Sequence, residues 1–158
     1  MEKFIAYLES KAHNHNDVFV RDIVFELRGP DASVLAHNDG RGAVITLYMG
    51  AIGDEARANG EPLAIETARA LAHEFRHLDQ LQAWDELPQV GVQAGEKSLG
   101  KPGWSAVYWH DPGEDDARQW ASEVVENMPE DVLNSFTTFV RELCAAKTRE
   151  EVERKATS

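Results

Sequence analysis

The chain lacks several features that mark large classes of protein. Only one of its 158 residues, Cys144, is a cysteine, so no disulfide can form within the chain, and a reducing compartment is the expected location. No apolar run approaches the ~20 residues of a membrane-spanning helix. The N-terminal residues also lack the apolar core and cleavage site of a signal peptide. We therefore expect an intracellular, cytoplasmic protein without a membrane partner.

Positive charge is also scarce. The chain has 16 lysines and arginines against 28 aspartates and glutamates, which gives a formal net charge of −12 at pH 7. A nucleic-acid-binding protein needs a basic face to neutralise phosphates, and the sequence shows none. Nucleic acid is therefore not an expected partner.

A small sheet is predicted within residues 18–49. Residues 18–28 are rich in β-branched and aromatic residues, and two further predicted strands, 33–37 and 43–49, flank the turn sequence "NDGRG". Asp39-Gly40, between the last two segments, is a strong signal for a β-hairpin. We expect an antiparallel or mixed sheet of about three strands.

Helices are expected to complete a single α+β domain over residues 1–158. Apolar spacing and capping residues predict helices at residues 1–12, 61–84, 111–128 and 130–156. The last region is expected to hold two helices, with Thr148 and Glu151 as candidate caps of a short final one. Between the second and third regions, residues 85–110 contain four glycines and two prolines, which predicts a long loop.

The predicted helix at 61–84 contains an HExxH pattern, "HEFRH". His73 and His77 are four residues apart, so they share one helix face and could bind one metal ion. Glu74 lies beside them, where it could take a proton from a metal-bound water without being a ligand. Such a short match also arises by chance in helices with solvent-facing histidines. A separate apolar stripe on this helix is predicted to face the core, and its residues are Leu71, Phe75 and Leu78.

A catalytic zinc site usually has a third protein ligand. Glu114 is a candidate because it shares an apolar face of its predicted helix, where a buried acid needs a partner such as a metal ion. The apolar residues of that face are Ala117, Ala121, Val124 and Met128. Alternatively, Glu114 is simply the capping-box glutamate of its own helix, behind Asp111 at the N-cap.

Two residues just before this helix are further candidates. Tyr108 and His110 could each donate a hydrogen bond to an oxyanion, and His110 could replace Glu114 as the third ligand. Alternatively, both are packed or solvated loop residues. Ala83 occupies the position where metzincins carry their third histidine, so that class of metallopeptidase is excluded.

The two motifs together resemble the zincin metallopeptidases of the gluzincin type. "HEFRH" matches their zinc-binding helix. "EDDARQWA" is similar to the ExxA(D/N)xFA glutamate helix of the CAAX prenyl protease and ImmA/IrrE-like types. The matched residues of this second motif are Glu114, Ala117, Trp120 and Ala121. The resemblance runs from the sheet to about residue 128, in the element order of minimal single-domain gluzincins.

This resemblance implies a zincin-like fold, with the sheet packed on the HExxH helix and the glutamate helix. It also implies that His73, His77 and Glu114 bind Zn²⁺. Glu74 would then be the general base of a zinc metalloendopeptidase that acts on a peptide or protein. The alternative is a non-enzymatic zincin-like protein, whose metal site is structural or which serves as a protein-interaction module.

Two arginines depart from the family pattern. Arg76 stands where many zincins have a small residue. Arg118 stands where the family often has an aspartate or asparagine that supports a ligand histidine. The candidate substitutes for that supporting residue are Asp79, Gln80 and Asp111.

Overall fold

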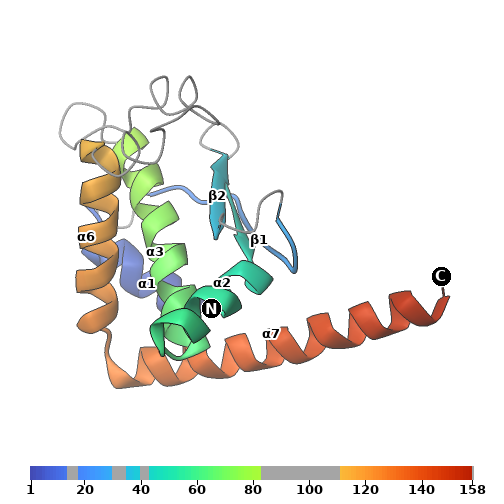
Figure 1. Cartoon of the computed structure of the whole chain (residues 1–158). Helices are drawn as coiled ribbons and strands as arrows, with labels where there is room; N and C mark the ends of the chain where they lie inside the picture. The colour runs from blue at the N-terminus through green and yellow to red at the C-terminus, as the bar shows by residue number, and fades with distance from the viewer. Residues whose placement is uncertain (14–17, 30–34, 40–42, 83–110, 158) are drawn as a thin grey trace.

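The structure is a computed structural model that describes residues 1–13, 18–29, 35–39, 43–82 and 111–157. These residues form an α+β fold of five helices and a three-stranded sheet (Figure 1). The helices are α1 (Glu2–Lys11), α2 (Met49–Asn59), α3 (Leu63–Gln82), α6 (Pro112–Glu126) and α7 (Glu130–Thr157). The strands are β1 (Asp22–Glu26), β2 (Ala36–Asp39) and β3 (Val44–Tyr48). The loop predicted at residues 85–110 lies outside the described residues.

The sheet is mixed, with β3 at its centre. β3 pairs in parallel with β1 and antiparallel with β2, and the antiparallel pair agrees with the predicted hairpin. Ile45 and Leu47 of β3 are fully buried and alternate with partly buried neighbours. The predicted strand at 33–37 ended too early, because β2 continues to Asp39 and places Asn38 opposite Ile45.

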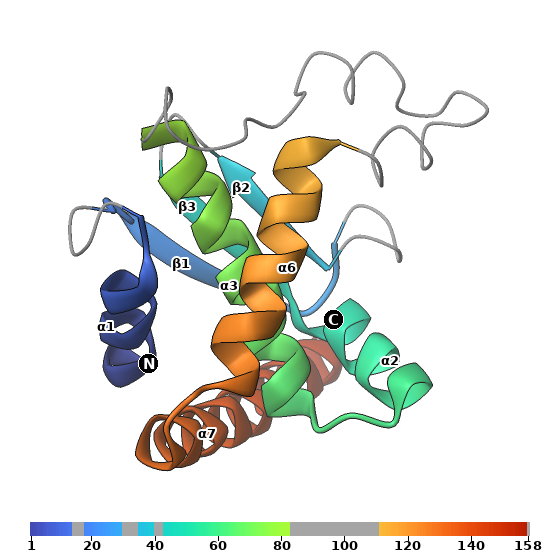
Figure 2. The same cartoon turned by 90° about the vertical axis from the view of Figure 1, so that its left-hand side faces the viewer.

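α3 runs between α6 and the sheet (Figure 1, Figure 2). The core beside it brings α1 and α7 together, since the rings of Phe4 and Phe136 lie with centroids 4.5 Å apart. Tyr7 of α1 also donates a hydrogen bond of 2.6 Å to the carbonyl oxygen of Val124 in α6. The position of α6 against α3 is therefore supported from α1.

α2 was not predicted from the sequence. The predicted strand at 43–49 included Met49, which is the first residue of this helix. Gly50 and Gly53 lower the helix propensity of the segment and hide the helical spacing of its buried residues. Gly60 was the available signal, because it ends α2 in the left-handed conformation with φ 64°.

α7 is one continuous helix of 28 residues, so the predicted short final helix is wrong. The Thr148 hydroxyl donates a hydrogen bond of 2.9 Å to the carbonyl oxygen of Cys144. Because the hydroxyl is satisfied by this bond to the preceding turn, Thr148 lies within the helix and does not cap a new one. α7 projects beyond the rest of the fold in Figure 1. No described helix is both long and apolar enough to cross a membrane.

Gly50 and Gly53 in α2 provide a matched pair of substitutions. A Cβ atom at Gly50 would lie 2.6 Å from the backbone oxygen of Leu27, whereas a Cβ at Gly53 would meet only an Arg57 side-chain atom at 3.9 Å. We expect Gly50→Ala to lower the free energy of unfolding by ~1–3 kcal/mol. Gly53→Ala should raise it by up to ~1 kcal/mol, because alanine is the better helix former. Urea denaturation measures both, and equal changes would contradict this account.

Candidate metal centre

α3 presents its two histidines on a face that is separate from its core-facing stripe. Leu71, Phe75 and Leu78 are almost completely buried in the core, as predicted. His73 is partly buried and His77 is buried. Their rings meet edge to face with centroids 4.7 Å apart. The helix thus separates a packing face from a polar face.

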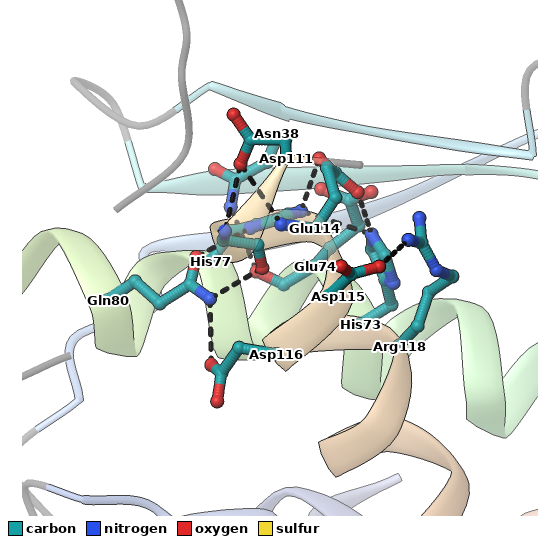
Figure 3. A network of polar contacts seen from close by, with 11 residues as sticks. Asn38, His73, Glu74, His77, Gln80, Asp111, Glu114, Asp115, Asp116 and Arg118 are labelled. Carbon is teal, nitrogen blue, oxygen red and sulfur yellow. Dashed lines mark hydrogen bonds and ion pairs between the residues drawn. The ribbon is translucent and has the colours of Figure 1, made fainter. Parts of the chain in front are cut away.

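The first turn of α6 brings a carboxylate to these histidines (Figure 3). Asp111 caps α6, since its carboxylate accepts hydrogen bonds from the backbone N–H groups of Gly113 and Glu114 at 2.8 and 3.2 Å. Glu114 is only 4% exposed, and its own carboxylate contacts both histidines. Ala117 and Ala121 are buried, and such small residues allow two helix axes to approach closely.

The three candidate ligands lie close to the spacing that a metal ion requires. The Nε2 atoms of His73 and His77 lie 3.0 Å apart. Each lies 3.0 Å from an oxygen of Glu114. Ligand atoms around a tetrahedral zinc ion with bonds of ~2.0–2.1 Å are separated by roughly 3.3 Å. A shift of a few tenths of an ångström would therefore let this cluster hold an ion.

Gln80 determines which nitrogen of His77 carries hydrogen. The Gln80 amide nitrogen donates to the Gly113 carbonyl oxygen and to Asp116 Oδ2, both at 2.8 Å. Its oxygen therefore faces His77 Nδ1, also at 2.8 Å. Because a carbonyl oxygen only accepts, Nδ1 carries hydrogen, and Nε2 of the neutral ring turns its lone pair toward Glu114. These two acceptors repel each other unless a proton or a metal ion lies between them.

Without a metal ion, that cation is a proton on His77. Burial alone would lower the pKa of His77, but the hydrogen bond with Glu114 and the charges of Glu74 and Glu114 outweigh burial and raise the pKa to about 9. Burial would raise the pKa of Glu114, but its bonds to the two histidines hold that pKa well below its usual range. A metal ion must displace the proton, so the cluster should bind metal more tightly as the pH rises.

Glu74 lies next to the cluster without belonging to it. Its charge acts on His77, and its backbone oxygen accepts a hydrogen bond of 2.9 Å from the side-chain amide of Asn38. This bond joins β2 to α3 beside the site (Figure 3). The other amide atom, Asn38 Oδ1, is buried and has no hydrogen-bond partner among the described residues. The edge strand thus places an unsatisfied acceptor close to Glu74.

Arg76 is held between two carboxylates. It donates two hydrogen bonds to Asp116 at 2.8 and 3.2 Å and one to Asp79 at 2.8 Å. Its guanidinium carbon lies 5.3 Å from the centre of the Trp120 ring. Burial would raise the pKa of Asp116, but Arg76 and Gln80 lower it below its usual value. Asp116 therefore carries charge beneath the site and ties α6 to α3.

Of the three candidate supports, Gln80 lies at hydrogen-bond distance from a ligand histidine, with its oxygen 2.8 Å from His77 Nδ1. Asp79 binds Arg76 and accepts a hydrogen bond of 2.8 Å from the backbone N–H of His13. Asp111 caps α6. Arg118 forms an ion pair with Asp115.

Two of the predicted site residues, Tyr108 and His110, lie outside the described residues. Asn38 and Asp116 take part in the polar network but were not among the predicted site residues. The signal for Asp116 was the presence of Arg76 on the opposing helix, since a buried arginine needs an acidic partner.

The cluster predicts that a divalent ion stabilises the protein. With Zn²⁺ as the probe at 100 times its dissociation constant, the free energy of unfolding should rise by ~2.7 kcal/mol. His77→Ala should abolish this rise, because it removes one of the three ligands. His37→Ala is the control, since His37 is exposed on β2, and it should keep the full effect. Thermal and urea denaturation with and without Zn²⁺ measure the difference, and an equal response of the two variants would refute the assignment.

The stability of the metal-free protein should depend on pH through His77. Its folded pKa of about 9 exceeds the unfolded value of ~6.5, so its contribution is complete below pH 6.5 and is lost as pH rises through 9. The stability advantage of wild type over His77→Ala should therefore shrink by up to ~3 kcal/mol between pH 6 and 10. Urea denaturation in the presence of a chelator measures it. A constant or growing advantage would show that His77 is not the proton carrier.

No protein-family model, curated protein or solved structure matches the chain. The function must therefore be inferred from the geometry of the described residues. It establishes that an α+β fold with a small mixed sheet brings His73, His77 and Glu114 into one cluster that can bind a metal ion.

Proposed function

We propose that the protein is a zinc-dependent metallopeptidase with a zincin-like fold. The observation that carries this proposal is the convergence of His73, His77 and Glu114, with Glu74 beside them on the same helix. Two imidazole nitrogens and one carboxylate are a ligand set of catalytic zinc sites. The packing of α3 between α6 and the sheet (Figure 2) supports the zincin-like assignment.

The ligand count favours a catalytic centre over a structural one. Structural zinc sites are usually closed by four protein ligands, whereas catalytic sites use three and keep one position for a reactant. Among the described residues, the cluster contains three candidate ligands. An open position is therefore expected on the side of Glu74.

The protein's own groups would divide the reaction between them. When bound, zinc supplies Lewis acidity, which acidifies a water molecule and polarises a carbonyl group. The Glu74 carboxylate accepts the proton of the attacking water and then donates it to the nitrogen of the leaving amine. The bond from Asn38 to the Glu74 backbone holds that part of α3 against the sheet. Glu74 keeps its distance from the histidines because all three belong to the same helix.

β2 is the strand best placed to bind an extended peptide. Among the described strands, β3 is paired on both sides, whereas β2 is paired with β3 alone, so β2 is the one of these two with an unpaired edge next to α3. A peptide could add to that edge through backbone hydrogen bonds.

Glu74→Gln is the decisive substitution for peptidase activity. It removes the proton acceptor but leaves the three ligands unchanged, so we expect unchanged zinc content and a ~10²- to 10⁴-fold loss of kcat. The measurement uses zinc-loaded protein and a pool of fluorescence-quenched peptides, with elemental analysis of each sample.

Glu126→Gln is the matched control, because this exposed residue of α6 carries the same change away from the site. It should leave both activity and zinc content unchanged. Activity that survives in Glu74→Gln would show that another group is the base. A zinc-loaded wild-type protein that cleaves no peptide in the pool would favour a non-enzymatic metal site.

A further inference from the structure

A chain of polar side chains lies behind His77 and has no part in the proton transfers proposed for Glu74. Gln80 is fully buried and accepts a hydrogen bond from His77 Nδ1 at 2.8 Å. The Gln80 amide nitrogen donates to Asp116 at 2.8 Å. Asp116 in turn accepts two hydrogen bonds from Arg76. None of the three residues behind His77 is a candidate metal ligand.

The orientation of the Gln80 amide decides whether His77 can bind a metal ion. A ligand histidine usually donates its second ring N–H to a carboxylate, a carbonyl oxygen or water, which fixes the ring. If the Gln80 amide turned over, its NH₂ group would face Nδ1. The ring hydrogen would then have to sit on Nε2, the atom that faces Glu114, and metal binding would be blocked.

Two acceptors hold the amide in the productive orientation. The Gly113 carbonyl oxygen and Asp116 Oδ2 both lie 2.8 Å from the Gln80 amide nitrogen. Turning the amide over would place its oxygen against both of them. The charged carboxylate of Asp116 makes this alternative especially unfavourable, since bonds to ionised acceptors are the stronger ones.

We infer that Asp116 and Gln80 are positioning residues of the metal centre, with Asp116 acting through Gln80 to keep the hydrogen of His77 on Nδ1. Arg76 holds Asp116 in place with two hydrogen bonds. This assignment rests on the metal centre of the proposed function but not on peptidase activity. In the family pattern, the residue at the position of Arg118 often supports a ligand histidine. In this chain, Gln80 and Asp116 would take that role.

Asp115 offers a control for the charge of Asp116. The two residues are neighbours on α6, but Asp115 is exposed and pairs with Arg118. Replacing either aspartate with asparagine removes one negative charge near the cluster. Asp115→Asn therefore controls for the loss of one negative charge from the first turn of α6, whereas the hydrogen bond to Gln80 belongs to Asp116.

The test is the zinc dissociation constant of the full-length protein, measured by competition with a chromophoric chelator. Gln80→Met removes both hydrogen-bonding groups at similar length and should weaken zinc binding by ~10- to 100-fold. Asp116→Asn should weaken it by roughly 3- to 10-fold, and Asp115→Asn should leave it unchanged. Gln80→Glu should keep affinity within about 3-fold of wild type, because a protonated carboxyl group keeps the acceptor for His77 Nδ1 and one of the two donor hydrogens of the amide.

A spectroscopic signal separates positioning from a general loss of structure. In zinc-loaded wild type, the Nδ1 proton of His77 should give an NMR signal that exchanges slowly with water. This signal should persist in Gln80→Glu and disappear in Gln80→Met, while the signals of the His73 ring stay in place as an internal reference.

The outcomes distinguish the two proposals. A Gln80→Met protein that binds zinc as tightly as wild type overturns the positioning role alone, as do equal losses in Asp115→Asn and Asp116→Asn. A wild-type protein that takes up no zinc overturns the metal centre and this role with it. If Gln80→Met does not fold, the Gln80→Glu and Asp116→Asn variants decide the question.

Discussion

The burial of the Glu114 carboxylate between α3 and α6 is the constraint on which the rest of the site depends. An ionised carboxylate removed from water is costly unless charge and hydrogen bonds compensate it. The compensation comes from α3, where His73 and His77 meet the two carboxylate oxygens. The N-terminus of α6 adds favourable backbone dipoles at the same place. A proton or a metal ion in the cluster therefore stabilises the packing of the two helices.

A second charged layer beneath the cluster follows from the same helix contact. Arg76 faces α6, and Asp116 and Asp79 both bind it. Removing one partner of such a buried pair costs ~3–5 kcal/mol. The arginine at a motif position where zincins often have a small residue is thus part of the α3–α6 contact. Its partner Asp116 also anchors Gln80, so the unusual Arg76 and the substitute support for His77 belong to one arrangement.

Sequence periodicity was sufficient for the features that lie within one long helix. The shared face of His73 and His77, and the inward face of Glu114, follow from 3.6 residues per turn and need no knowledge of neighbouring elements. The place of Asn38 could not be predicted in this way, because it depends on strand register, where a slip of one residue reverses the side-chain direction. The helix break expected at Thr148 does not occur, because the Thr148 hydroxyl donates a hydrogen bond to a carbonyl oxygen within the same helix. Side-chain networks across two helices depend on tertiary packing that periodicity does not contain.

The candidate ligands come from two helices, so the packing of α6 against α3 influences whether a proton or a metal ion occupies the cluster. His73, Glu74 and His77 belong to one helix and keep their mutual positions, whereas Glu114 comes from α6 alone. A shared proton suits the observed N···O spacing of 3.0 Å, but a tetrahedral zinc ion needs roughly 3.3 Å between its ligands. A closer approach of α6 therefore favours the proton, and a slightly wider one favours the metal. Contacts far from the cluster, such as the bond from Tyr7 to the carbonyl of Val124, influence the same balance because they set where α6 lies.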